Sequence, residues 1–196
     1  MPAVIKKSEI RWKTSVRIRF GFTGFSGEQA VPIIRKLLDD QWPSVRRPKQ
    51  CTYIIRVKGE VAVAYGDRHS PVVYIGEGDA YHRLYNHARW IASLLVSVPR
   101  LEIEVYVAQV SRRNNKVLYK YIEADMIKWF RDEYGYLPWF NRQSERSKEG
   151  VYDYDFDAMK ELRRNLLLGS GNKILWAIRP APKNTQFAPY DRNSHV

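Results

Sequence analysis

Apolar and polar residues alternate early in the chain before a longer period takes over. Between residues 16 and 22 every second residue is apolar, which predicts a half-buried strand whose open face carries Arg17 and Arg19. The apolar positions that follow recur at helical spacing and begin with a serine and a glutamine spaced as a capping box, so a helix is expected over 26–42. We interpret residues 44–50, which are rich in arginine and lysine, as a basic linker.

The middle of the chain predicts a hairpin, a helix and a third strand. The runs 52–58 and 72–76 are rich in β-branched and aromatic residues, and a polar turn at 66–67 separates them, which indicates an antiparallel pair. An aspartate can cap a helix over 79–93, and the alternation over 101–110 is typical of a strand.

The last third of the chain predicts two helices and a short strand. A basic turn precedes a helix over 118–134, which a glycine and a proline end. Asp157 is expected to cap a second helix that ends at residue 168, and 174–178 has the pattern of a strand. The tail 180–196 is expected to be extended or frayed. The expected fold class is therefore α/β (α+β), a small mixed or antiparallel sheet flanked by helices in one compact domain.

Composition agrees with a packed globular chain. Of 196 residues, 44% are hydrophobic and 28% are charged, which argues against wholesale disorder. The longest apolar run is far shorter than a membrane span, and the first residues lack a signal-peptide pattern, so no membrane partner is expected. The single cysteine, Cys51, excludes an intrachain disulfide and a cysteine-rich zinc site. We therefore expect a cytoplasmic protein in a reducing compartment.

The net charge of +12 indicates an anionic partner and is unevenly distributed. Residues 1–50 carry +7, residues 51–141 carry +2 and residues 142–196 carry +3. Most attraction to a polyanion would therefore come from the flanks. The basic candidates for contact with DNA phosphates, for which plain solubility is the alternative role, are Arg17, Arg19, Arg46, Arg47, Lys49, Arg112, Arg113 and Lys116.

The central segment gathers residues that suit phosphodiester hydrolysis. Tyr53 and Tyr74 lie on the two strands of the predicted hairpin, and Arg83 and His87 lie one turn apart on one face of the next helix. Glu123 lies on an apolar row of the helix over 118–134, where a carboxylate is costly unless it is paired or binds a cation. Taken singly, each tyrosine would be a packing residue, and the arginine and histidine would belong to a solvated helix face.

In order along the chain, these motifs resemble the GIY-YIG nuclease family over residues 51–141. The matching elements are Cys51-Thr52-Tyr53, Tyr74-Ile75-Gly76, the Arg83-x-x-x-His87 helix, the helix that carries Glu123, and Asn141. The chain departs from the family where Cys51-Thr52 replaces Gly-Ile. The distance from Tyr53 to Tyr74 also implies an enlarged hairpin over 58–71.

The resemblance implies an α/β nuclease module that hydrolyses DNA with Mg²⁺, or Mn²⁺ in its place, bound by Glu123. It implies that Arg83 binds the phosphate, that Tyr53 is the general base, and that Tyr74 and His87 position water and phosphate. Gly76 and Asn141 would support the site. Chemistry alone selects His87 as the base instead, because the pKa of histidine lies near neutrality. Both assignments of the base stay open at this point.

The organisation of the chain suggests a type of nuclease. Residues 1–50 and 142–196 are expected to be extensions of a module over 51–141, which favours a compact endonuclease of restriction type that cuts duplex DNA. A homodimer is expected, because one active site cuts one strand. The alternatives are a nucleic-acid-binding protein that keeps the fold without cutting, and a homing, repair or structure-specific nuclease, including one that prefers RNA.

Overall fold

A four-stranded antiparallel sheet forms the centre of the computed structural model, which describes residues 2–19, 24–42, 47, 49–98, 100–143, 145–167 and 174–179. Its strands, in spatial order, are β2 (Ile10–Arg19), β7 (Glu102–Val110), β3 (Cys51–Lys58) and β6 (Val72–Gly78). The three predicted strands of the central segment are confirmed. The fold is a mixed α/β fold of the α+β kind, as the sequence predicted.

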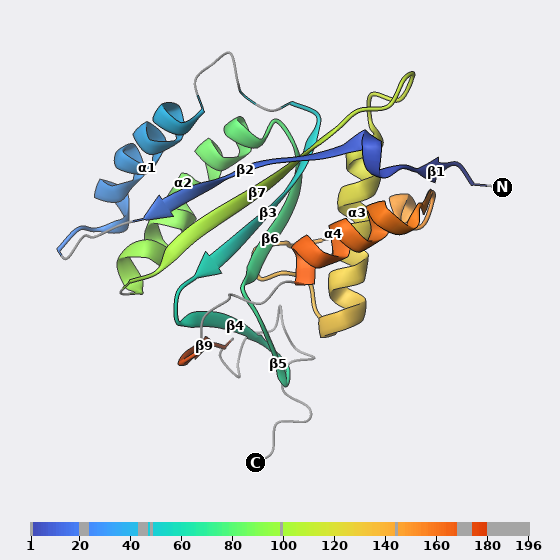
Figure 1. Cartoon of the computed structure of the whole chain (residues 1–196). Coiled ribbons are helices and arrows are strands. Elements are labelled where there is room, and N and C mark those ends of the chain that lie inside the picture. Colours follow the sequence, from blue (N-terminus) through green and yellow to red (C-terminus); the bar gives the residue numbers. More distant parts are fainter. Residues whose placement is uncertain are drawn as a thin grey trace.

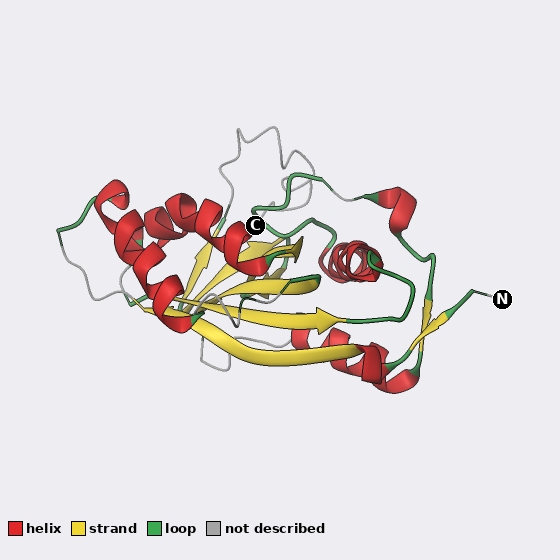
Figure 2. Ribbon diagram, turned by 90° about the horizontal axis from the view of Figure 1, so that it is seen from above, coloured by secondary structure: helices red, strands yellow, loops and turns green. Residues whose placement is uncertain are grey.

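The helices gather toward opposite ends of the strands (Figures 1 and 2). One group is α1 (Gly27–Gln41) with α2 (Ala80–Ser97), and the other is α3 (Leu118–Tyr134) with α4 (Phe156–Leu167). Both α2 and α3 pack against β3, β6 and β7, so both helices can place side chains next to those of the β3–β6 hairpin. Helix α3 has the predicted bounds, and Gly135 ends it with a left-handed φ of 76°.

Local signals set the starts of three helices. Ser26 and Gln29 form the predicted capping box of α1, and Asp79 accepts a hydrogen bond from the His82 N–H at the start of α2. The predicted cap of α4 is wrong: Asp155 Oδ1, rather than Asp157, accepts the Ala158 N–H at 2.7 Å. Both aspartates have the right chemistry, and only the path of the chain into the helix decides between them.

The segment between β3 and β6 is more than a simple hairpin connection. It contains β4 (Val61–Tyr65) and β5 (Arg68–Ser70), and the predicted turn at 66–67 joins these two strands instead of β3 and β6. Strand β4 also pairs in parallel with β9 (Trp176–Ile178), which gives a second, three-stranded sheet. The C-terminal part of the chain therefore completes the enlarged connection.

The N-terminal segment meets the segment that precedes α4. Strand β1 (Val4–Ile5) pairs in parallel with β8 (Asp153–Tyr154), and α4 packs against the short helix η1 (Lys7–Glu9). The other short helix is η3 (Arg146–Lys148). The predicted strand over 16–22 begins earlier, at Ile10, and its residues 20–22 lie outside the described residues, as do the tail 180–196 and most of the basic linker.

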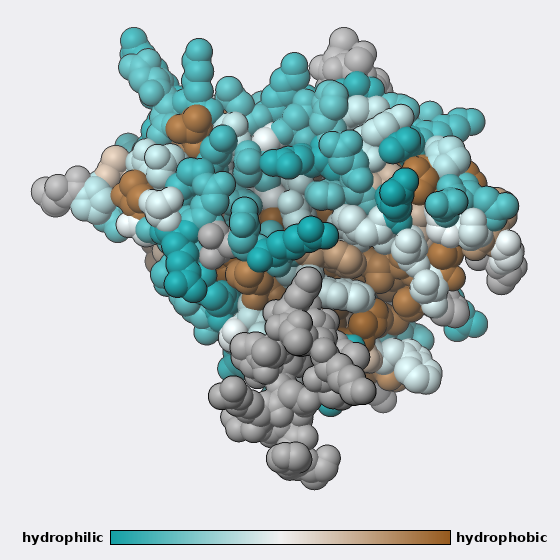
Figure 3. All heavy atoms as spheres, turned by 180° about the vertical axis from the view of Figure 1, so that it is seen from behind, coloured by the Kyte–Doolittle hydropathy of each residue, from teal (hydrophilic) through white to brown (hydrophobic). Residues whose placement is uncertain are grey.

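Gln41 closes the outer edge of β2. Its side-chain amide donates to the Arg17 carbonyl at 3.0 Å and its oxygen accepts the Arg17 N–H at 3.2 Å, so it pairs with the strand as a neighbouring backbone would. Seen from behind, hydrophilic residues cover most of the surface, and apolar ones gather toward its lower part (Figure 3). Within the described ranges, no helix is both long and apolar enough to cross a membrane.

Candidate active site

Tyr53 and Tyr74 meet over Gly76. Tyr53 on β3 lies directly opposite Gly76 on β6, and the centroids of the two tyrosine rings are 6.0 Å apart. A Cβ atom at Gly76 would lie 2.5 Å from the Tyr74 ring and 2.6 Å from the Tyr53 hydroxyl oxygen. Only glycine therefore allows both rings to pack against this strand.

The two residues before Tyr53, Cys51 and Thr52, have structural roles. The Cys51 thiol donates to the Gly78 carbonyl at 2.9 Å, and the Thr52 hydroxyl donates to the Tyr119 carbonyl at 2.9 Å. The threonine thereby joins β3 to α3, one turn before Glu123. Tyr53, which follows them, lies in register with Gly76.

Helix α2 brings Arg83 and His87 to the end of β6. The His87 ring packs edge-on against Tyr74, with centroids 4.8 Å apart and an interplanar angle of 66°. Arg83 Nη2 lies 3.4 Å from Glu77 Oε1, and about half of the Arg83 side chain (51%) is exposed. Asp79 caps this helix immediately after β6, so the strand and the helix hold the three side chains together.

A cavity of about 420 Å³ lies between these residues and α3. It is lined by Tyr74, Glu77, Arg83, His87, Trp90, Glu123, Phe140, Asn141, Arg142, Gln143 and Glu145. The sequence-predicted residues Tyr74, Arg83, His87, Glu123 and Asn141 thus converge on one space. Tyr53 lies behind Tyr74, fully buried.

Asn141 fixes the loop that closes the cavity. Its Nδ2 donates to the Ile75 carbonyl at 2.8 Å, and its Oδ1 accepts the Ile75 N–H at 2.9 Å. The Phe140 N–H also donates to the Val73 carbonyl at 2.9 Å. The loop is therefore bound to the free edge of β6 like an additional strand.

Burial raises the pKa of one candidate base, Tyr53, and lowers the pKa of the other, His87. Burial, with Tyr74 beside it, holds the pKa of Tyr53 well above its usual value, which opposes the phenolate that a base requires. Burial and then Arg83 lower the pKa of His87 to about 4, so its imidazole is neutral at pH 7. His87 Nε2, which is buried, has no hydrogen-bond partner among the described residues.

Glu123 shares the cavity with a second carboxylate. Burial and then the neighbouring Glu77 raise the pKa of Glu123 to about 7. Glu77 is not among the residues predicted from the sequence, although its place directly after Gly76, at the end of a strand that leads to Arg83, is a signal that could have indicated it. The structure also adds Trp90, Phe140 and Arg142 to the site.

The donor set fits a hard divalent cation. Mg²⁺ often takes only one or two carboxylates and completes its shell with water and substrate phosphate. Glu123 and Glu77 offer such a pair, and their mutual repulsion would be relieved by a cation between them. Across the part of the chain that the structure describes, no group of three or more His, Cys, Asp or Glu residues is placed so that it could hold a metal ion.

The described members of the predicted DNA-contact set do not line this cavity. Four of the arginines form ion pairs within the chain: Arg17 with Glu104 (2.9 Å), Arg19 with Glu102 (2.6 Å), Arg47 with Asp39 (3.2 Å) and Arg112 with Glu9 (2.5 Å). Lys49, Arg113 and Lys116 are exposed, and Arg46 lies outside the described residues.

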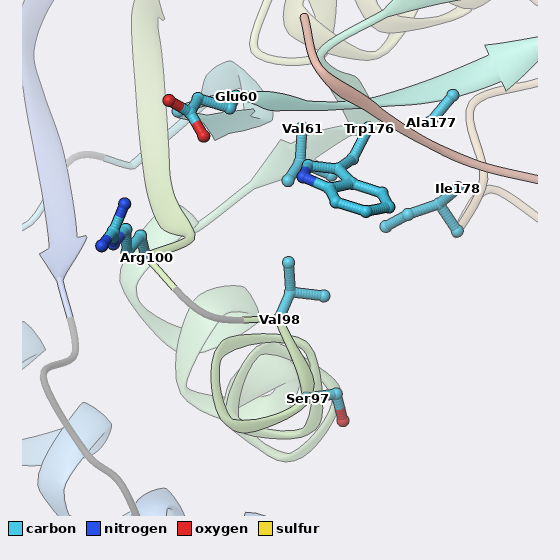
Figure 4. A pocket seen from close by; sticks show the side chains of 9 residues that line it. Glu60, Val61, Ser97, Val98, Arg100, Trp176, Ala177 and Ile178 are labelled. Carbon is cyan, nitrogen blue, oxygen red and sulfur yellow. The ribbon is translucent and has the colours of Figure 1, made fainter.

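A second and larger cavity, of about 760 Å³, lies between the β3–β4 turn, the end of α2 and β9. The Trp176 indole extends into it across from Val98, and Arg100 and Glu60 lie toward one side (Figure 4). None of the candidate catalytic residues lines this space.

The chain was also compared with known proteins. No protein family, no curated protein and no solved structure matches it. What the chain does is therefore inferred from the residues that the fold gathers around the smaller cavity.

Proposed function

We propose that the chain is a divalent-metal-dependent endonuclease that hydrolyses phosphodiester bonds in DNA. The observation that carries the proposal is the convergence of Tyr74, Arg83, His87 and Glu123 on one cavity. These side chains come from a strand and two helices, and together they offer a phosphate-binding cation, a neutral imidazole and a carboxylate that is unusually easy to protonate. Phosphodiester hydrolysis requires functions of these kinds.

Arg83 binds the scissile phosphate in this proposal. Its guanidinium is exposed enough to reach a ligand, and its one contact with Glu77, at 3.4 Å, is long for an ion pair. A phosphate would make charge-assisted hydrogen bonds with the guanidinium. The same group then counters the negative charge that develops on phosphorus.

Glu123, with Glu77 beside it, would hold the metal ion. When bound, Mg²⁺ supplies a Lewis acid that stabilises the developing charge and lowers the pKa of a bound water. Glu123 must lose its proton to bind a cation, and with a pKa of about 7 both the protonated and the ionised form are populated at neutral pH.

His87 is the preferred proton acceptor, in place of Tyr53. The imidazole is neutral and its buried Nε2 is without a partner within the described residues, whereas burial disfavours the Tyr53 phenolate. A phosphate between Arg83 and His87 would offset the repulsion that lowers the histidine pKa, and so make the imidazole a stronger base in the complex. Tyr74, which lines the cavity, then orients the water and the phosphate, and Tyr53 packs behind it.

The proposed substrate is duplex DNA, as for a restriction-type enzyme, and cleavage of both strands requires two copies of the chain. The test is incubation of supercoiled plasmid with the purified protein in Mg²⁺, in Mn²⁺ and in EDTA. Cleavage in either metal, its loss in EDTA, and its loss in Glu123→Gln and Arg83→Ala are expected. Asp132→Asn is the matched control, because Asp132 is an exposed carboxylate on the same helix.

Two outcomes would overturn parts of this proposal. A folded protein that binds DNA but cuts neither plasmid, single strand, fork nor structured RNA is a binding protein and not a nuclease. A clear preference for RNA would reject the substrate and keep the reaction. His87→Ala and Tyr53→Phe, compared in the same assay, assign the base by which substitution abolishes cutting at every pH.

A further inference from the structure

Three aromatic rings form a stack at the cavity that contains Arg83 and Glu123. The centroids of Trp90 and Phe140 are 4.0 Å apart with their planes inclined at 19°, and those of Phe140 and Trp139 are 4.7 Å apart at 28°. All three side chains are only partly buried. Trp90 and Phe140 line the cavity itself, so the stack ends in one of its walls.

The stack is held by rigid elements. Trp90 lies on α2, nearly one turn after His87, and Phe140 is held to β6 by the hydrogen bond from its N–H to the Val73 carbonyl. Asn141 secures the same loop through both hydrogen bonds of its amide to Ile75. A ligand that stacked here would meet preordered rings, and therefore little side-chain entropy would be lost on binding.

Among the described residues, Phe140 is the ring that stacks nearly parallel on Trp90. The His87 ring also contacts Trp90, but the two centroids are 5.6 Å apart and the planes are inclined at 51°. An indole has two faces, and Trp90 lines the cavity beside the candidate catalytic residues. A flat group that entered the cavity could therefore stack on the indole next to a phosphate held by Arg83.

The chemistry of this wall suits a nucleobase. Contact with the phosphates of a stacked duplex calls for cations, which an aromatic wall does not provide. Base faces inside a duplex are covered by their neighbours, so only a base that has left the stack can use such a wall. Arg142 and Gln143 are exposed and line the same cavity, where they can contact the edge of that base.

We infer that Trp90 receives, by stacking, an unpaired nucleobase adjacent to the scissile phosphate, and that the preferred substrate carries an unstacked nucleotide at the cut. The inference rests on the proposed function and narrows its substrate to DNA that is distorted, bulged or single-stranded at the site of cleavage. A bulge, a gap and a base extruded by the protein each present an unstacked nucleobase of this kind.

The experiment measures binding and cleavage separately. Binding is measured in a Glu123→Gln background with three duplexes of one sequence: an intact one, one with a single-nucleotide bulge, and one with a 2-aminopurine in the bulge. We expect tighter binding to the bulged duplex, and 2-aminopurine fluorescence quenched on binding. Trp90→Leu should reduce the preference for the bulge about tenfold and abolish the quenching, because stacking on one aromatic ring supplies that much affinity.

Two further variants separate stacking from folding. Trp90→Tyr keeps an aromatic ring and should retain most of the preference, whereas Trp90→Leu keeps only apolar bulk. Trp176→Leu is the matched control, because Trp176 is 71% exposed but lines the other cavity, and it should keep the wild-type preference. Circular dichroism and thermal unfolding check that each variant is folded.

The possible outcomes distinguish the inference from the proposed function. Equal affinity for intact and bulged duplexes, or unchanged quenching in Trp90→Leu, rejects the stacking role even where Mg²⁺-dependent cleavage is present. A bulge preference that depends on Trp90, in a protein that cuts nothing in Mg²⁺ or Mn²⁺, supports stacking and rejects the nuclease. Equal losses of binding to both duplexes in a folded Trp90→Leu protein show a packing role and also reject the inference.

Discussion

Gln41 and Asn141 play the same role at opposite edges of the four-stranded sheet. Each uses both hydrogen-bonding groups of its side-chain amide to pair with the N–H and the carbonyl of one residue on an outer strand, Arg17 on β2 and Ile75 on β6. An amide replaces a missing strand at both edges. Only the β6 edge borders the candidate active site, so of the two residues only Asn141 bears directly on that site.

Asn141→Asp should destabilise the protein by about 1–3 kcal/mol, because a carboxylate would face the Ile75 carbonyl in a buried position without a donor. Urea unfolding at pH 7 measures the loss. Gln41→Glu makes the same chemical change at an exposed edge and should cost less, since water can hydrate the carboxylate. Equal losses of unfolding free energy in the two variants would show that the difference in burial between Asn141 and Gln41 does not set the cost.

Gly76→Ala should abolish cleavage, because the new methyl group cannot coexist with both tyrosine rings in their present places. Overpacking of this kind costs about 1–3 kcal/mol in stability. Gly135→Ala is a suitable control: its φ of 76° makes it similarly unfavourable for alanine, but no atom lies within 4 Å of its added Cβ. Full activity in a folded Gly76→Ala protein would show that the tyrosine pair is not needed.

Glu123 should make the metal-free protein less stable as pH rises. Its pKa is raised from 4.5 to about 7, so the fold favours the protonated form, and stability falls between those two pH values as the carboxyl ionises. Glu123→Gln should therefore be more stable than wild type at pH 8, by about 3 kcal/mol at most, and this difference should disappear below pH 4.5. Urea titrations across this range measure it, and a difference that does not vary with pH would contradict the assignment.

The His87 imidazole should titrate near pH 4, a midpoint that NMR of its ring protons can follow. Since Arg83 contributes to the lowering after burial, Arg83→Gln should move the midpoint upward. An unchanged midpoint would show that burial acts alone. The folded state favours neutral His87, so its contribution to stability is lost as pH falls from 6.5 through 4.

Arg113 and Lys116 are better candidates for DNA contact than Arg112 in the same turn. Both are exposed, whereas Arg112 is bound to Glu9 and to the Val4 carbonyl. Replacing the exposed pair with glutamine should lower the salt slope of DNA binding by up to about 2 without changing the unfolding midpoint. Arg112→Gln should instead destabilise the fold by about 1–3 kcal/mol, as it leaves Glu9 without its partner. An unchanged salt slope in the double variant would show that these charges do not meet phosphate.

Local sequence signals were enough for much of the architecture. Helix α3 has its predicted bounds, because apolar periodicity and Gly135 act within a few residues of one another. The hairpin of β3 and β6 follows from two β-rich runs, but the parallel pairing of β4 with β9 does not, since the two strands are more than a hundred residues apart. The same limit explains the choice of Asp155 over Asp157 as a cap, which depends on where the chain enters α4.

For the candidate site, the sequence by itself determined which residue types are available and in what order. Only the tertiary structure decided that Glu77 shares a cavity with Glu123, that Trp90 stacks on Phe140, and that most of the predicted DNA-contact arginines are engaged in ion pairs. It also gave the two candidate bases different surroundings, since Tyr53 is fully buried and His87 lines the cavity. The reason is physical: burial, ion pairing and ring stacking belong to neighbours in space, and a linear pattern does not specify them.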